Sequence, residues 1–66
     1  EKVRNVLLGL PEDQRQVIML RFYEDWSHAE TAAALGRSEE ASRALQYRAM
    51  ENLRRMLLLN QGKGVL

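Results

Sequence analysis

One residue, Gly36, separates two predicted helices in the middle of this chain of 66 residues. The segment before it, "SHAETAAAL", and the segment after it, "EEASRALQYRA", follow each other almost without a linker. Two helices joined by so tight a turn meet at a steep angle and bury little surface against each other. The second helix is therefore directed outward, as in modules that place a helix in the groove of a nucleic acid.

Local signals define the ends of both helices. Ser27 followed by Glu30 is a capping box, in which each side chain satisfies an unpaired backbone N–H of the other residue. Gly36 ends the helix because glycine adopts the left-handed conformation without strain. Ser38 then caps the next helix, and two glutamates follow it in the first turn, where negative charge is favourable.

The rest of the chain also reads as helical, because no stretch shows the strict alternation of a strand. We expect an all-α, four-helix domain with a helix-turn-helix and a long C-terminal helix. A first helix covers about 2–8, and a second opens with Pro11 as its first helical residue and runs to about Tyr23. Residues 1–59 are expected to form the domain, and residues 60–66, "NQGKGVL", a flexible tail.

Helical spacing predicts which side chains are buried. The expected core contains Val3, Val6, Leu7, Leu10, Val17, Ile18, Leu20, Phe22, Trp26, Leu45, Ala49, Met50, Leu53, Met56 and Leu57. Ser42 falls on the same face although it is polar, so its hydroxyl would have to bond to the carbonyl of Ser38. The segment "RRMLLL", residues 54–59, is expected to pack on the first helix, or a partner protein covers its surplus leucines.

Composition excludes several classes of site. The chain has no cysteine and a single histidine, His28, so we expect neither a disulfide nor a metal site, and no cofactor. His28 reads as a packing or surface residue. We find no catalytic constellation and expect that the protein is not an enzyme. No apolar run is long enough to span a membrane and the sequence shows no signal-peptide pattern, so a cytoplasmic setting without a membrane partner is expected. Because the chain begins with Glu1, it is expected to be a piece of a longer protein.

Charge is distributed unevenly about the turn. The net charge of the chain is +1, but residues 1–33 hold four basic and six acidic residues, whereas residues 34–66 hold six basic and three acidic ones. The outward face of the fourth predicted helix carries Glu40, Arg43, Ala44, Tyr47, Arg48, Glu51, Arg54 and Arg55. Arginine can contact guanine or phosphate, and alanine permits close approach to a base. The alternative is an ordinary solvated face, which also places charges at helical spacing.

The ordered set of landmarks along residues 7–57 resembles a known family. "LP" opens the second helix, "LRF" lies near its end, "SHAE" stands at the cap, "A-x-x-L-G-x-S" passes through the turn, and "RA" lies inside the last helix. This arrangement is similar to the C-terminal promoter-binding domain (region 4) of bacterial sigma factors, and most of all to the extracytoplasmic-function group.

The resemblance implies a domain that recognises the upstream (−35) promoter element through its helix-turn-helix, in transcription initiation. It also implies docking on the β flap of the RNA polymerase core. The DNA-contacting positions of the family fall on Arg43, Ala44, Tyr47 and Arg48, and Ser38 and Glu39 lie where backbone N–H groups meet a phosphate.

Three positions depart from the family pattern. Thr31 and Ser42 replace branched apolar residues of the helix-packing core, and Glu40 replaces a frequent glycine near the DNA. These departures indicate weaker packing between the two helices. Two alternatives stay open, the first because its helix-turn-helix looks similar and the second because of Glu40 and the low net charge. One is the helix-turn-helix output domain of a response regulator. The other is a protein-interaction module that is bound by an anti-sigma factor or another regulator.

Overall fold

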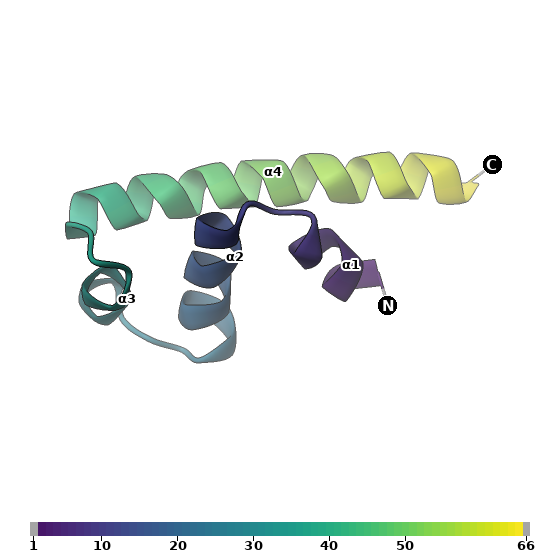
Figure 1. The fold of residues 1–66 in the computed structure, drawn as a ribbon. Coiled ribbons are helices and arrows are strands. Elements are labelled where there is room, and N and C mark those ends of the chain that lie inside the picture. The colour runs from purple at the N-terminus through teal and green to yellow at the C-terminus, as the bar shows by residue number, and fades with distance from the viewer. Residues whose placement is uncertain (1, 66) are drawn as a thin grey trace.

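A computed structural model describes the backbone of residues 2–65 and the side chains of residues 5–59. All of the regular elements in this part of the chain are helices (Figure 1). They are α1 (Lys2–Leu8), α2 (Glu12–Ile18), the π-helical turn η1 (Met19–Tyr23), α3 (His28–Leu35) and α4 (Glu39–Val65). The all-α class and the four predicted helices are confirmed.

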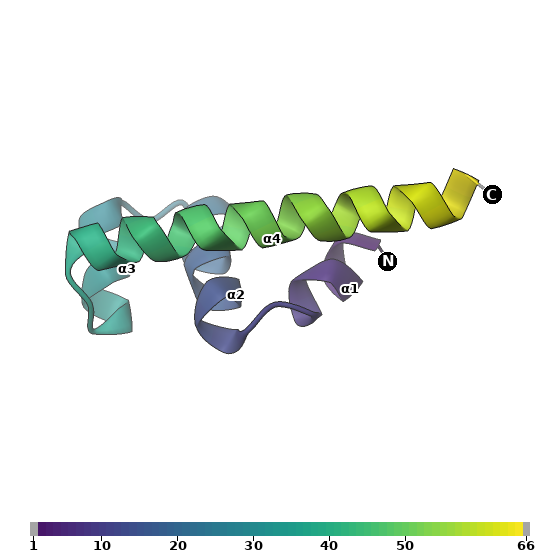
Figure 2. The same cartoon turned by 90° about the horizontal axis from the view of Figure 1, so that it is seen from above.

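Helix α4 is the axis on which the other helices are arranged. In Figure 1, α3 lies beneath its N-terminal end, α2 meets its middle, and α1 lies on the side toward its C-terminus. Figure 2 shows the same order from above. Since α4 is longer than the body formed by the other helices, the molecule is elongated, with extents of 43 × 19 × 16 Å.

The second predicted helix consists of two parts. Pro11 is the N-cap of α2 and lies just outside the helix, so its predicted place as the first helical residue is off by one. After Ile18 the hydrogen bonds change to the wider π pattern, in which the N–H of Glu24 donates to the carbonyl of Met19 at 3.0 Å. Asp25 then takes a left-handed conformation with φ of 60°, which directs the chain into α3.

The core lies where α1, α2 and α4 meet. Its buried side chains are Leu7, Leu10, Val17, Ile18, Leu45 and Ala49, and the partly buried Leu35, Leu53 and Met56 pack against them. Val6 is also buried, as predicted, whereas the side chain of Val3 lies outside the described residues. Removal of this apolar surface from water is the main stabilising term that such a small domain has.

Several residues predicted to be buried are exposed. Phe22 is 54% exposed and Trp26 is 36% exposed, so both predictions are wrong. The helical spacing used for Phe22 fails because a π turn holds more residues than an α turn and rotates the following side chains to another side. On α4, Met50 is 44% exposed and Leu57 is 38% exposed, so these two predictions are wrong as well.

The end of α4 lies beyond the predicted one. The helix runs to Val65, whereas the sequence predicts an end near residue 59. The side chains of residues 60–66 lie outside the described part of the chain, so the flexible tail stays a prediction. Leu58 and Leu59 are exposed, while Met56 packs against the core. Within the described residues, no helix combines the length and the apolar character that crossing a membrane requires.

Two buried hydroxyls lie on the helices of the helix-turn-helix. Thr31 in α3 is fully buried, and its Oγ1 donates to the carbonyl of Ser27 at 2.8 Å. Ser42 in α4 is 1% exposed, as the helical spacing predicts. Its hydroxyl does not bond to Ser38, so that expectation is wrong. The Ser38 carbonyl accepts from the backbone N–H of Ser42 at 2.9 Å, and Ser42 Oγ has no partner among the described residues. A buried polar group without a partner is destabilising.

Replacement of Ser42 by valine should therefore stabilise the domain. The change removes an unpaired hydroxyl and adds apolar surface, and we expect the free energy of unfolding to rise by about 1 kcal/mol. For a domain of this size that corresponds to a rise of roughly 4–8 °C in the midpoint of thermal denaturation. Ala41→Val is the matched control, because it adds the same side chain at an exposed position one residue earlier and should not stabilise. An unchanged midpoint for Ser42→Val would contradict the prediction.

Candidate nucleic-acid interface

The turn between α3 and α4 is built from the signals that the sequence shows. Ser27 Oγ accepts from the N–H of Glu30 at 3.0 Å, and Glu30 Oε1 accepts from the N–H of Ser27 at 2.8 Å. Gly36 has φ of 67°, and the N–H of Arg37 bonds back to the carbonyl of Ala32 at 2.9 Å. The capping box and the left-handed glycine are therefore confirmed. Together they fix where α3 ends and how the chain reverses into α4.

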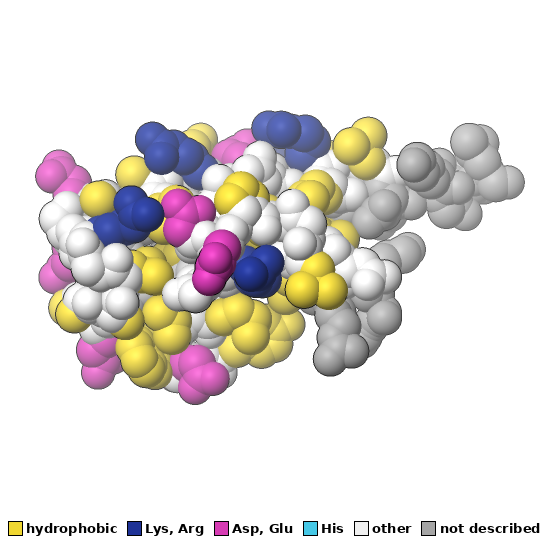
Figure 3. All heavy atoms as spheres, viewed as in Figure 1, with side chains coloured by type: hydrophobic (Ala, Val, Ile, Leu, Met, Phe, Trp, Pro, Cys, Tyr) yellow, Lys and Arg dark blue, Asp and Glu magenta, His cyan; other side chains and the backbone are white. Residues whose placement is uncertain are grey.

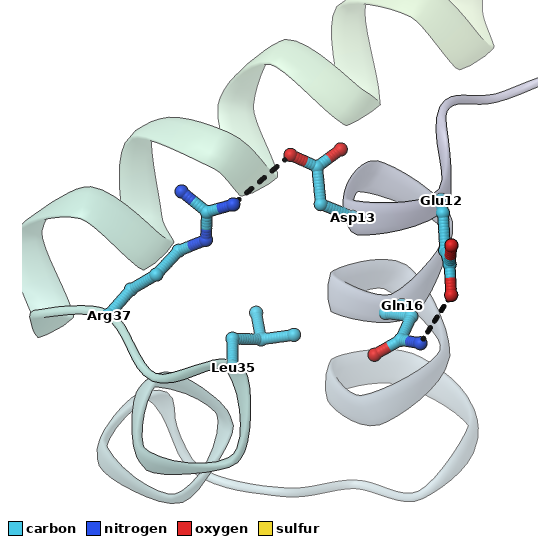
Figure 4. A pocket seen from close by; sticks show the side chains of 5 residues that line it. All are labelled: Glu12, Asp13, Gln16, Leu35 and Arg37. Carbon is cyan, nitrogen blue, oxygen red and sulfur yellow. Dashed lines mark hydrogen bonds and ion pairs between the residues drawn. The ribbon is translucent and has the colours of Figure 1, made fainter.

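A pocket between α2 and this turn contains the ion pair that joins them. Its volume is about 410 Å³, and it is lined by Glu12, Asp13, Gln16, Leu35 and Arg37. Figure 4 shows Arg37 reaching from the turn toward Asp13, with 3.3 Å between Nη2 and Oδ2, and Leu35 pointing between them. Both side chains of the pair are more than 40% exposed, so it contributes at most about 1 kcal/mol. It connects the turn to α2 but adds little stability.

The predicted outward face of α4 is exposed throughout. The side chains of Arg43, Ala44, Tyr47 and Arg48 are all on the surface, and Tyr47 is 68% exposed. Figure 3 shows basic side chains over α4 along the upper part of the molecule, while most hydrophobic side chains on this side lie along the lower edge. We call the surface formed by Arg43, Ala44, Tyr47 and Arg48 the recognition face.

Acidic residues lie next to the recognition face. Glu39 Oε1 is 3.4 Å from Arg43 Nη2, one turn earlier on the same helix, and both side chains are more than half exposed. An exposed pair of this kind contributes only about 0.3–0.5 kcal/mol, so a nucleic acid can displace it readily. Glu40 is exposed beside it. Arg43 is thus held only by a weak contact on the surface of α4.

The first turn of α4 offers backbone donors. Ser38 Oγ accepts from the N–H of Ala41 at 3.1 Å, and the Ser38 carbonyl accepts from the N–H of Ser42. The N–H groups of Glu39 and Glu40 have no carbonyl one turn earlier in the helix to which they can donate. Ser38 and Glu39 thus stand at an end that suits a phosphate by its dipole, although the two glutamate side chains oppose a negative partner.

Comparison with known proteins decides the family. Residues 6–55 match the family described as Sigma-70, region 4, which covers most of the chain. The chain belongs to this family. The match favours the sigma-factor hypothesis over the response-regulator alternative.

Three relatives show the same relationship. The chain is 44% identical over 48 residues to the ECF RNA polymerase sigma factor BldN of Streptomyces coelicolor, an alignment that covers 73% of this chain and 18% of the relative. It is 40% identical over 62 residues to the ECF RNA polymerase sigma factor SigX of Bacillus subtilis, covering 89% of this chain and 32% of the relative. It is 43% identical over 54 residues to the RNA polymerase sigma-E factor of Streptomyces coelicolor, covering 82% of this chain and 30% of the relative. The aligned part is thus at most about a third of each relative.

Sequence reasoning missed a side-chain cluster behind the recognition face of this region 4 domain. Arg21 of η1 donates from Nε to Gln46 Oε1 in α4 at 3.3 Å and from Nη1 to the carbonyl of Trp26. His28, in the first turn of α3, lies close to Arg21 and Arg43. Gln46 and Arg43 are far from Arg21 in the sequence, so helical spacing carried no signal of these contacts.

The environment of His28 favours its neutral form. Desolvation is the first cause that lowers the pKa of His28 below its ordinary value of 6.5, and the charges of Arg21 and Arg43 lower it further. Glu39 opposes them by raising the pKa. The Nδ1 atom is buried and has no hydrogen-bond partner among the described residues. A proton added to His28 would thus meet two guanidinium groups and one carboxylate.

The domain should consequently lose stability in mild acid. Because the pKa of His28 is lower in the folded state than in the unfolded one, His28 favours folding above pH 6.5, and this contribution disappears as the pH falls below that value. The measurement is the thermal midpoint between pH 7.5 and pH 5 for the unmutated domain and for His28→Gln, which cannot titrate. We expect a shallower pH dependence for His28→Gln. If the thermal midpoints of the two proteins change with pH in parallel, His28 is not the group that causes the loss of stability.

Proposed function

We propose that this domain binds the upstream (−35) promoter element as part of a sigma factor that directs RNA polymerase in transcription initiation. The observation that carries the proposal is the exposed basic and aromatic recognition face on the second helix of a tight helix-turn-helix, in a chain of the Sigma-70, region 4 family. Each relative described above is named as a sigma factor of RNA polymerase, and the proposal extends that activity to this chain.

The residues of the recognition face have separate roles in this proposal. Arg43 lies early in α4 and its side chain is exposed. From this position its guanidinium pairs with two acceptors on a guanine in the major groove. Ala44 permits close approach of the helix, and Tyr47, one turn after Arg43, supplies an aromatic ring with a polar tip. Arg48 lies at the flank, where it neutralises a phosphate. The backbone N–H groups around Ser38 and Glu39 contact a second phosphate.

A different surface suits the RNA polymerase core. A groove of about 440 Å³ on α4 is lined by Met50, Glu51, Leu53, Arg54, Leu57 and Leu58. Its leucines and methionine are partly exposed although they are apolar, and exposed apolar clusters mark protein interfaces. We assign this groove to the polymerase, at the β flap, because it lies along α4 beyond the recognition face and leaves that face available to DNA.

Footprinting tests the proposal. The full-length protein that contains this domain is assembled with the RNA polymerase core and bound to fragments of promoter DNA. Protection of an upstream element by the assembled enzyme, together with its loss when Arg43 and Tyr47 are both changed to alanine, is the expected result. The same double variant must still bind the core, since neither residue lies in the apolar groove. Protection that persists in the double variant would show that another surface binds the DNA.

One alternative function is favoured by specific observations. The apolar groove and the acidic Glu40 beside the recognition face also suit a protein-interaction module that an anti-sigma factor or another regulator binds. In that case the assembled enzyme would give no upstream footprint, whereas Leu57→Glu would abolish capture of the regulator. Because the polymerase is assigned to the same groove, the two functions are separated by the upstream footprint and its dependence on Arg43 and Tyr47.

A further inference from the structure

We propose that Arg21 is a positioning residue for DNA recognition: through Gln46 it sets the rotation of α4 about its own axis, and thereby where Arg43 and Tyr47 meet the bases. The inference rests on the proposed function and assigns a role to a residue outside the recognition face. Arg21 belongs to η1, so it acts from the second helical segment and not from the helix-turn-helix itself.

The position of Gln46 on α4 explains why it can control rotation. Successive residues of an α-helix are about 100° apart, so Gln46 lies on the flank between Leu45 and Tyr47. Leu45 is buried in the core and Tyr47 is exposed on the recognition face, while Gln46 is half-buried between them. A hydrogen bond on this flank resists rotation of α4 about its axis, which would move Tyr47 across the major groove of bound DNA.

The apolar core restrains this rotation only in part. On the N-terminal half of α4 the buried side chains are Ser42, Leu45 and Ala49, two of which are small. The Ser42 hydroxyl makes no hydrogen bond within the described residues, so it contributes no directional contact. Apolar packing is non-directional, whereas the planar fork of a guanidinium imposes direction. The Arg21–Gln46 contact therefore supplies an orientation that this part of the core does not.

Arg21 is itself held in place from another side. Its Nη1 donates to the carbonyl of Trp26, in the loop that leads into α3, while its Nε donates to Gln46 at 3.3 Å. The N–H of Trp26 in turn donates to the carbonyl of Leu20 at 2.9 Å. One guanidinium thus connects η1, the entry to α3 and the flank of α4. Lysine retains the charge but not the fork, so it cannot maintain both contacts with one fixed geometry.

The chain contains a matched control at the other end of the same interface. Asn52 of α4 donates from Nδ2 to Gln14 Oε1 of α2 at 2.7 Å. Gln14→Met and Gln46→Met each remove the acceptor of one hydrogen bond between α4 and the segment from α2 to η1, with the same change of side chain. Asn52, the partner of Gln14, lies more than one helical turn beyond Arg48 and away from the recognition face.

The experiment uses the full-length protein assembled with the RNA polymerase core and a panel of single-base variants of its upstream promoter element, at two salt concentrations. For Arg21→Lys and for Gln46→Met we expect discrimination between the cognate element and its variants to fall on the order of tenfold, part of what a bidentate base contact provides. Gln14→Met should keep the unmutated discrimination. Since Arg21→Lys keeps the charge, the salt dependence of its binding should be unchanged. The variant that combines Arg21→Lys with Gln46→Met should lose no more discrimination than either single variant, because both changes act through the same contact.

Three results would overturn the inference. They are unchanged discrimination in Arg21→Lys and Gln46→Met, an equal loss in Gln14→Met, and a loss in Arg21→Lys that is uniform across all promoter variants. The thermal midpoints of all variants are measured first, and binding is compared below the lowest of them, so that loss of folding is not read as loss of discrimination. If the unmutated enzyme itself shows no preference among the promoter variants, the proposed function fails and the inference fails with it.

Discussion

The isolated domain should bind promoter DNA roughly 10²–10⁴-fold more weakly than the same domain within the assembled polymerase, because tethering replaces a bimolecular encounter by an intramolecular one. The recognition face supplies Arg43 and Arg48, but Glu39, Glu40 and Glu51 lie on the same helix and are exposed. Few phosphates are therefore neutralised, and phosphate neutralisation provides most of the affinity of a protein for DNA. We expect a dissociation constant of about 1 μM or weaker for residues 1–66 at physiological salt.

The affinity is measured by titration of labelled promoter DNA with the fragment and, separately, with the assembled enzyme. Circular dichroism of the fragment confirms that it is helical under the conditions used. Glu40→Gln is an informative companion, because it removes one exposed acidic charge and should strengthen binding at low salt more than at high salt. Nanomolar binding by the fragment at physiological salt would show that the domain does not depend on tethering.

Replacement of Arg43 by alanine should cost about 1–3 kcal/mol of binding free energy on the cognate promoter and reduce discrimination among variants of the upstream element. In the proposed role the guanidinium would pair with a guanine through two hydrogen bonds, and alanine could form neither. The exposed pair with Glu39, at 3.4 Å, is too weak to prevent this contact. The measurement is binding of the assembled enzyme to a panel of single-base promoter variants.

Arg48→Ala is the control for this prediction. It removes the same charge from the same face of α4, but from the flank. We expect it to weaken binding to cognate and variant promoters alike and to lower the salt dependence by about one counterion. If Arg43→Ala instead leaves the order of preference intact, α4 does not read the bases, and the interaction-module alternative becomes the better explanation.

The local architecture of this domain could be predicted because its signals act over a few residues. Ser27 and Glu30 satisfy each other within one turn, and Gly36 needs only its own conformational freedom. The division of α4 into a core side with Leu45 and Ala49 and an outward side with Arg43 and Tyr47 follows from helical spacing alone. For these reasons the fold and the candidate recognition face could both be inferred from the sequence.

Contacts between distant residues could be decided only by the tertiary structure. The π turn over Met19–Tyr23 moves Phe22 out of the core, and spacing that assumes an α-helix does not anticipate it. The Ser42 hydroxyl has no hydrogen-bond partner among the described residues, whereas the Thr31 hydroxyl bonds to the carbonyl of Ser27. Arg21 meets Gln46 across 25 positions of sequence, where no periodicity relates them. The sequence by itself determined where the helices begin, end and face; the packing of those helices against one another decided which polar side chains meet.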